Sequence, residues 1–192
     1  MFQGRRERNL MIIRQAKVND WKGIARVHVD CVRSSYKNIL PPDTLDKFTY
    51  NTREQRWKKD LPSSTTGGTM TYVVEDGNGT IVGFSLAGTM RDARLRIKYT
   101  GEIYGVYVHP DVQGKGYGRK LFECAIQHLT SVHFSTIALW TFKDLQSGAF
   151  FKHLDGEQVY EKSTTIGGEK LEEIAYGWDN LKPFSVLTED LN

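Results

Sequence analysis

Residues 102–121 read Glu102-Ile-Tyr-Gly-Val-Tyr-Val-His-Pro110-Asp-Val-Gln-Gly-Lys-Gly-Tyr-Gly118-Arg-Lys-Leu121, and they determine most of what the sequence predicts about the fold. The first half of this stretch is rich in β-branched and aromatic residues, which predicts a strand that ends at Pro110. Three glycines follow at alternate positions, and a helix is predicted to begin directly behind them. Glycine lets neighbouring backbone N–H groups turn toward one point, and a helix N-terminus adds about half a positive charge there. The stretch therefore predicts an anion-binding loop suited to a pyrophosphate.

The spacing of the glycines narrows the kind of phosphate loop. A Walker loop needs Ser or Thr after its lysine, whereas Gly118 is followed by Arg119 and Lys120. A dinucleotide loop needs two residues between its last two glycines, and here Tyr117 stands alone. Both nucleotide patterns fit poorly, and a plain tight turn is the alternative. Lys115 and Arg119 supply cations that can pair with phosphates.

Hydrophobic periodicity predicts further elements on both sides of this stretch. Upstream, the sequence predicts a strand at 11–16, helical regions at 19–32 and 42–61, and two strands at 69–75 and 81–90. Downstream, it predicts a helix at 116–132, a strand at 136–142, a short helix at 144–154, and strands at 158–166 and 170–178. This order indicates one mixed α/β domain. The unit over 102–142 should form a parallel strand pair through a right-handed crossover.

Composition and charge exclude several classes of protein. The 192 residues suffice for one sizeable core, and 26 Lys and Arg against 23 Asp and Glu leave a net charge of only +3. We therefore expect no nucleic-acid partner, which would need a clustered basic surface. No run approaches about 18 consecutive apolar residues, so no membrane-spanning helix is expected.

Cysteine use and the chain ends complete the expected organisation. Cys31 and Cys124 are too few for a disulfide framework, and the histidines lack ligand-like spacing, so we expect a cytoplasmic protein with no metal. Residues 1–10 hold no apolar segment of a signal peptide. The domain is expected to span 11–182, preceded by a frayed or extraneous segment at 1–10 and followed by a tail at 183–192.

The loop Gln113-Gly-Lys-Gly-Tyr-Gly118, behind the strand that ends in Val108-His-Pro-Asp111, resembles the acyl-CoA-binding signature Gln/Arg-x-x-Gly-x-Gly/Ala of the GNAT superfamily, the Gcn5-related N-acetyltransferases. The order of elements over 11–178 is also similar, and the residues after the first helix, with Arg56-Trp57, resemble those of a poorly characterised bacterial group. The resemblance implies a GNAT-like sheet of about seven strands, mixed and mostly antiparallel, with flanking helices and one parallel pair around the CoA loop.

The same resemblance implies an activity. It indicates transfer of an acetyl group from acetyl-CoA, as cosubstrate, to a primary amine of a small molecule or peptide, directly within a ternary complex. An acyl-CoA-binding module with little or no catalysis is the alternative. Relatives in the superfamily often form dimers, so a homodimer is an open option.

The resemblance also implies which residues hold the cofactor. Backbone amides of the loop would bind the pyrophosphate, and the preceding strand would hydrogen-bond the pantetheine arm like an added strand. The expected cofactor-binding residues are Val106, Tyr107, Val108, Gln113, Gly114, Lys115, Gly116, Tyr117, Gly118, Arg119 and Asp144.

Acyl transfer sets the requirements for the remaining site residues. A lysine-like amine has a pKa near 10.4, so a base must remove its proton. Glu102 lies eleven residues before Gln113, as in the histone-acetylating branch, and is the candidate base; a solvated strand-edge glutamate is the alternative. A backbone N–H at Val106 or Tyr107 is expected to polarise the thioester carbonyl. Arg33 and Tyr36 are expected to line the acceptor pocket, with a plain surface helix as the alternative reading of these residues.

A second stretch, residues 139–156, resembles the family's strand followed by Asn-x-x-Ala and Phe-Tyr-x-x-x-Gly, but departs from it. Asp144 replaces Asn, Ser147 replaces Ala, Phe151 replaces Tyr and Asp155 replaces Gly. That tyrosine commonly protonates the departing thiolate, and a phenylalanine has no proton to donate. The tyrosines that remain as candidate donors are Tyr104, Tyr107, Tyr117 and Tyr160.

Two further features allow more than one interpretation. The basic segment 91–98 is either a solvated loop or a guide for acidic groups of a ligand. His28 lies on the apolar stripe of the first helix, where a histidine with satisfied hydrogen bonds is more common than a catalytic base.

Overall fold

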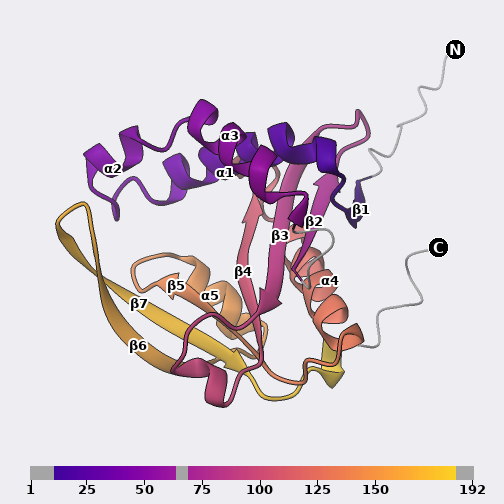
Figure 1. Ribbon diagram of the computed structural model, residues 1–192, viewed down its shortest axis with the longest axis vertical. Helices are drawn as coiled ribbons and strands as arrows, with labels where there is room; N and C mark the ends of the chain where they lie inside the picture. The colour runs from indigo at the N-terminus through magenta and orange to yellow at the C-terminus, as the bar shows by residue number, and fades with distance from the viewer. Residues whose placement is uncertain (1–10, 64–68, 185–192) are drawn as a thin grey trace, which may run out of the picture.

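Seven strands form one sheet in the computed structural model, which describes residues 11–63 and 69–184 (Figure 1). They are β1 (Ile12–Gln15), β2 (Met70–Glu75), β3 (Ile81–Thr89), β4 (Gly101–Val108), β5 (Ile137–Phe142), β6 (Glu157–Ile166) and β7 (Glu169–Trp178). Their order is β1-β2-β3-β4-β5-β7-β6, and every neighbouring pair is antiparallel except β4 with β5. The mixed, mostly antiparallel sheet is confirmed. The predicted segment 1–10 and residues 185–192 of the predicted tail lie outside the described residues.

Helices cover both faces of the sheet (Figure 1). They are α1 (Trp21–Ser35), α2 (Pro42–Asp46), α3 (Tyr50–Asp60), α4 (Tyr117–Ser131) and α5 (Ser147–His153). Successive side chains of a strand point to opposite faces. Val73 of β2 packs with Ile24 of α1 and Trp57 of α3, whereas Val74 packs with Leu121 of α4. The helices α1 and α3 therefore lie on one face, and α4 lies on the other.

The helical region expected at 42–61 divides into two helices, α2 and α3. Thr49 has an extended backbone, and its hydroxyl accepts a hydrogen bond from the Thr52 N–H at 3.2 Å. The Thr52 hydroxyl in turn accepts from the Thr49 N–H at 3.2 Å. This reciprocal capping satisfies backbone donors at a new helix start, which explains the break. The helix α3 then presents Arg53, Arg56 and Trp57 on one side, because residues three and four apart share a helix face.

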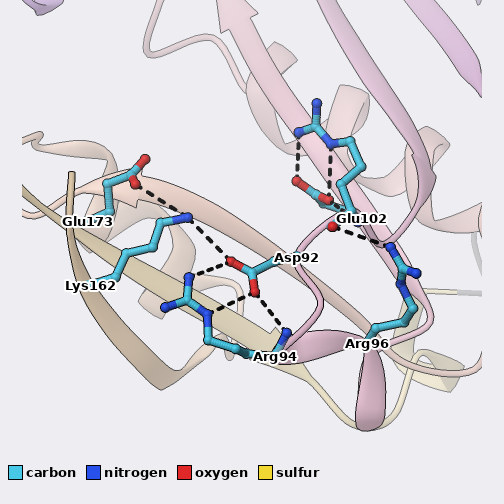
Figure 2. A network of polar contacts seen from close by, with 7 residues as sticks. Asp92, Arg94, Arg96, Glu102, Lys162 and Glu173 are labelled. Carbon is cyan, nitrogen blue, oxygen red and sulfur yellow. Dashed lines mark hydrogen bonds and ion pairs between the residues drawn. The ribbon is translucent and has the colours of Figure 1, made fainter. Parts of the chain in front are cut away.

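The basic segment 91–98 is a mostly exposed loop, as one of its two interpretations expected, and ion pairs of Asp92 attach it to the neighbouring strand β6. Asp92 forms ion pairs with Arg94 at 2.9 Å and with Lys162 of β6 at 3.4 Å (Figure 2). The hydrogen bond from Arg94, followed by other contacts, holds the pKa of Asp92 well below its usual value. Leu95 is buried in a short 3-10 helix, while Arg91 and Arg94 remain exposed.

Packing of the core continues past the expected domain end at residue 182. Phe184 is buried in the cluster that contains Phe122 of α4 and Trp178 of β7. The Phe122 ring lies at centroid distances of 5.7 Å from Phe184 and 5.0 Å from Trp178. The first residues of the predicted tail thus belong to the core.

The parallel strands β4 and β5 pair only at their beginnings. Two residue pairs connect them, Gly101 with Ile137 and Glu102 with Ala138. Beyond Glu102, β4 stays paired with β3 on its other side, while β5 is paired with β7. The second half of β4 therefore presents backbone groups toward β5 without a strand partner. A gap opens at the carboxyl ends of two parallel strands, which is where open α/β sheets bind ligands.

Candidate active site

The glycine loop leads from β4 into α4 and exposes backbone donors. Gly114 and Gly116 have φ angles of +74° and +84°, which L-residues rarely adopt, and a Cβ on either would meet open space. Gly116 is the N-cap residue of α4 and has no side chain with which to cap the helix. The first N–H groups of the helix are therefore free to meet an anion. The loop has the open, donor-rich form that a pyrophosphate requires.

The free edge of β4 offers hydrogen-bonding groups at alternate residues. The His109 N–H donates to the Val82 carbonyl of β3 at 2.8 Å. Because backbone groups alternate in direction along a strand, those of Tyr107 also point toward β3. The backbone groups of Val106 and Val108 point the opposite way, into the gap beside β5. Of the two expected thioester-polarising positions, Val106 is the one whose N–H faces the gap.

Side chains from two other elements reach the same edge. Cys31 Sγ of α1 and Gln113 Nε2 of the glycine loop donate to the Val108 carbonyl at 3.2 and 2.8 Å. Burial raises the pKa of the Cys31 thiol to about 12. This thiol is therefore protonated at neutral pH and acts as a hydrogen-bond donor rather than as a nucleophile.

A cavity of about 810 Å³ lies between β4, β5, the glycine loop and the end of α1. Ten of the eleven predicted cofactor-binding residues line it: Val106, Tyr107, Val108, Gln113, Gly114, Gly116, Tyr117, Gly118, Arg119 and Asp144. Lys115 does not line this cavity. Tyr36, predicted to contact the acceptor, lines it as well. Arg33, its predicted companion, is exposed on α1 with its guanidinium 5.4 Å from the ring centroid of Tyr50.

A second cavity of about 430 Å³ lies beside β4 under α3. Its walls come from α1, α3, β3 and β4 and include Arg53, Arg56 and Arg91. The residues Tyr104, Gly105 and Tyr107 line both cavities. The two cavities therefore meet at this point of β4. Arg53 was not singled out from the sequence; the signal that could have found it is its spacing from Arg56 and Trp57 on one helix face.

Tyr107 lies at the junction of the cavities, Tyr36 lines the larger cavity, and each of the two side chains affects the pKa of the other. The Tyr107 ring lies over Gly105, where a Cβ would collide with it, and stacks on Phe84 with centroids 4.8 Å apart. Burial raises the pKa of both tyrosines above the usual value, so both are protonated at neutral pH. Both tyrosines line the larger cavity, so the O–H of either one can donate to a group held there.

Phe151 of α5 stands where the resemblance leads one to expect a tyrosine, and it is buried. Its ring packs in an aromatic cluster at centroid distances of 5.2 to 6.4 Å from Phe122, Phe150, Tyr176 and Trp178. Position 151 therefore contributes an apolar part of the cavity wall, and the tyrosines that line the same cavity are Tyr36, Tyr104, Tyr107 and Tyr117.

Glu102 lies at the base of the gap, where Arg91 holds it. Its carboxylate accepts hydrogen bonds from the Arg91 backbone N–H at 2.8 Å and from the Arg91 guanidinium at 2.7 and 3.2 Å. Its side chain is 4% exposed, and it lines neither cavity. The Arg91 guanidinium in turn lies 3.8 Å from the ring centroid of Tyr104. Glu102 thereby fixes Arg91 at the wall of the second cavity.

His28 forms part of the wall of the second cavity. Its Nδ1 accepts a hydrogen bond from Trp57 Nε1 at 3.1 Å. Burial, followed by the positive charges of Arg53 and Arg56, lowers the His28 pKa to about 3. The imidazole is therefore neutral at neutral pH, and one ring nitrogen of this histidine is hydrogen-bonded within the protein. The rings around it, at centroid distances of 4.7 to 6.0 Å, are those of Phe48, Trp57, Phe84 and Tyr107.

Comparison with known proteins identifies the family to which this site belongs. Residues 33–155 match the acetyltransferase (GNAT) family. The chain belongs to this family. This GNAT protein is 32% identical over 178 residues to the uncharacterized N-acetyltransferase YuaI of Bacillus subtilis (strain 168), with 93% of this chain and 98% of that protein covered.

Solved structures share the fold at lower sequence identity. One is yncA, a putative acetyltransferase from Salmonella typhimurium with acetyl-CoA, at 22% identity and a TM-score of 0.66, covering 90% of this chain and 95% of that one. Another is the PaiA N-acetyltransferase of Thermoplasma acidophilum in complex with coenzyme A, at 15% identity and a TM-score of 0.64, covering 85% and 98%. The predictions of a GNAT fold, an acetyltransferase and acetyl-CoA as its cosubstrate are confirmed.

Within residues 11–63 and 69–184, no helix has the length and apolar character needed to cross a membrane. No group of three or more His, Cys, Asp and Glu side chains in the same ranges is placed to hold a metal ion.

Replacing Gly116 with Asp is expected to weaken acetyl-CoA binding by at least about tenfold, measured by titration calorimetry. An L-residue at a φ of +84° costs about 1–2 kcal/mol, and the added carboxylate faces an anion site. Gly168→Asp is the matched control, because Gly168 has a φ of +87° and open space but lies in the β6–β7 turn. Equal acetyl-CoA affinity of the two variants would contradict the placement of the pyrophosphate.

Proposed function

We propose that this GNAT enzyme transfers the acetyl group of acetyl-CoA directly to a primary amine of a small molecule or peptide, within a ternary complex. The junction of two cavities at Tyr104, Gly105 and Tyr107 carries the proposal. The larger cavity contains the glycine loop and the free edge of β4, and the second cavity reaches the same point of β4 from the side of α3. Donor and acceptor can therefore reach one point of β4 from separate sides, as a direct transfer requires.

Acetyl-CoA fits the larger cavity by its chemistry. The N–H groups of residues 113–118 would bind its pyrophosphate, and the free backbone groups of Val106 would pair with its pantetheine amides in the manner of an added strand. Arg119 lines the same cavity and forms an ion pair with Glu123 at 2.8 Å, which fixes its guanidinium beside the loop. The cosubstrate supplies an activated acyl group as a thioester.

The chain's own groups can then assist each stage of the transfer. The Val106 N–H, pointing into the gap, would donate to the oxygen that becomes negatively charged when the amine attacks. The O–H of Tyr36 or of Tyr107 would protonate the departing sulfur. The protonated thiol of Cys31 supports direct transfer over a covalent acyl-enzyme, and the free thiols of Cys31 and Cys124 support a reducing, cytoplasmic setting.

Removal of the proton from the amine is the step that Glu102 was predicted to serve. All three hydrogen bonds that Glu102 accepts come from Arg91, and the carboxylate lines neither cavity. These contacts favour a positioning role in which Glu102 holds Arg91, with a water molecule in the second cavity taking the proton of the amine. The role of Glu102 as general base stays a prediction.

Purified enzyme is expected to release free CoA thiol when it is mixed with acetyl-CoA and a suitable primary amine. The amount of thiol released should be proportional to the amount of acceptor amine supplied. Initial rates at varied concentrations of both substrates should give intersecting double-reciprocal lines, because a ternary complex requires both substrates before any product leaves. Parallel lines would instead indicate a covalent acyl-enzyme. Acetyl-CoA binding without turnover of any amine would favour the alternative, an acyl-CoA-binding module, which the phenylalanine at position 151 makes a specific rival.

Tyr107→Phe and Tyr36→Phe are expected to lower kcat by about 10²-fold or more for whichever tyrosine donates the proton, with the acetyl-CoA KM nearly unchanged. Because burial raises the pKa values of both tyrosines, loss of this proton should cause no decrease in rate at any pH below 9. Phe150→Leu, at the edge of the same cavity, is the control for altered packing. Full activity of both tyrosine variants would remove the pair from the mechanism.

Glu102→Gln is expected to raise the acceptor KM and to lower kcat by less than about tenfold, leaving the shape of the pH–rate profile unchanged. The amide keeps one acceptor for Arg91 but loses the ion pair. A loss of about 10² to 10⁴ in kcat together with disappearance of the acidic limb would instead establish Glu102 as the general base. The measurement is kcat and KM between pH 5.5 and 9.5, so that the two roles give opposite results.

A further inference from the structure

The second cavity is strongly positive, although the chain as a whole is nearly neutral. Three guanidinium groups line it, those of Arg53, Arg56 and Arg91. Among the described lining residues, Asp60 is the only carboxylate, and it pairs with Arg56 at 3.1 Å in an exposed i,i+4 ion pair. Exposed pairs of this kind contribute little. Residues 64–68, between the lining residues Ser63 and Thr69, are Ser, Thr and Gly in the sequence and carry no charge.

Arg53 has no anionic partner within the described residues. Its guanidinium lies 4.2 Å from the ring centroid of Phe48, and its Nε is buried without a hydrogen-bond partner. Burial, together with the nearby positive charge of Arg56, lowers the pKa of Arg53. A buried donor without a partner costs free energy, which an acceptor oxygen from a ligand would recover.

Arg91 lines the same cavity and has N–H donors that are not used by Glu102. The Glu102 carboxylate binds the Nε and one terminal nitrogen of Arg91. The Arg91 guanidinium also packs against the Tyr104 ring. The guanidinium carries five N–H donors in a fixed fork, so the donors of the other terminal nitrogen face away from the Glu102 pair. A second arginine is therefore held in place for planar recognition of an anion.

We propose that the acceptor of this enzyme carries a carboxylate in addition to its primary amine, and that Arg53 and Arg91 bind this group. The inference rests on the proposed acetyl transfer, since it names the substrate class of the same site. The acidic group would anchor at the arginines, while the amine points toward the junction at Tyr104 and Tyr107. A diamine or polyamine would place uncompensated positive charge beside three guanidiniums.

The cationic surroundings also assist the chemistry. Positive charges close to an ammonium group favour its neutral form. His28, in the wall of the same cavity, already responds in this way, since Arg53 and Arg56 add to burial in keeping it neutral. An amine whose molecule is anchored by its acidic group would therefore lose its proton more readily near this wall, with no carboxylate base required there.

The test compares L-amino acids with their amides as acceptors, with cadaverine as a diamine. We expect kcat/KM for an amino acid to exceed that for its amide by about 10- to 100-fold, the factor of one charge-assisted hydrogen-bonded pair. The amine of the amide is the less basic of the two, so amine basicity alone would give the opposite preference. An equal or higher kcat/KM for the amides or for cadaverine would overturn the inference and leave the proposed acetyl transfer intact.

Variants of α3 assign the effect to Arg53. Arg53→Met is expected to raise the KM for the amino acid at least about tenfold and to abolish most of the preference for the amino acid over its amide, while Arg53→Lys retains part of that preference. Lys59→Met is the matched control, since it removes one positive charge from the same helix outside both cavities. Equal losses for amino acid and amide, or a weakened affinity for acetyl-CoA, would overturn the assignment.

Binding separates failure of this inference from failure of the proposed function. Calorimetric titration of the protein saturated with CoA should show tighter binding of the amino acid than of its amide, and Arg53→Met should remove the difference. This preference in the absence of any turnover would support the anion site and refute the acetyl transfer. Turnover of amines without any such preference would support the acetyl transfer and refute the anion site.

Discussion

Backbone hydrogen bonding along β4 determines where a ligand can bind in this protein. The strand pairs with β3 along nearly its whole length but with β5 at only two residue pairs, starting at Gly101 and Ile137. A Cβ on Gly101 would come within 3.0 Å of Ile137 Cγ2, so glycine permits the close start of this pairing. Beyond it, β5 is committed to β7. An unpaired buried edge is costly unless something supplies hydrogen bonds, and a ligand with amides along its length is suited to do so.

A bulge in β4 places the reaction point on this edge. The register with β3 shifts so that Leu86 faces Gly105 and Ala87 faces Ile103, which leaves Tyr104 without an opposite residue. A bulge bends its strand and redirects the neighbouring side chains. Tyr104 is thereby free to donate its hydroxyl to the Thr89 carbonyl at 2.7 Å and to support Arg91 with its ring. The two cavities meet at this irregularity, so the same local distortion opens the cofactor side and the acceptor side together.

The sequence predicted what depends on neighbouring residues and missed what depends on distant ones. The strand, the glycine loop and the helix behind it follow from local conformational preferences, and ten of eleven expected cofactor residues accordingly line one cavity. The meeting of Tyr36 with Tyr107 joins residues 71 positions apart, and the pairing of Arg91 with Glu102 depends on how β3 and β4 align. No pattern of neighbouring residues in the sequence predicts either of these two contacts. The division of the helical region at Thr49 did have one, since Thr49 and Thr52 stand at capping-box spacing.

The positive charge of the second cavity and the phenylalanine at position 151 both affect how protons are gained and lost during acyl transfer. Acyl transfer from a thioester to an amine needs a proton removed from nitrogen and leaves negative charge on sulfur. Guanidinium groups near the reaction point favour a neutral amine and also favour a thiolate, because both changes reduce the net positive charge nearby. A thiol pKa of about 8.5 already makes the thiolate an acceptable leaving group. An enzyme with this charge pattern therefore depends less on a dedicated base and acid, and the loss of a tyrosine from α5 can be tolerated while the Tyr36 and Tyr107 pair retains a proton to donate.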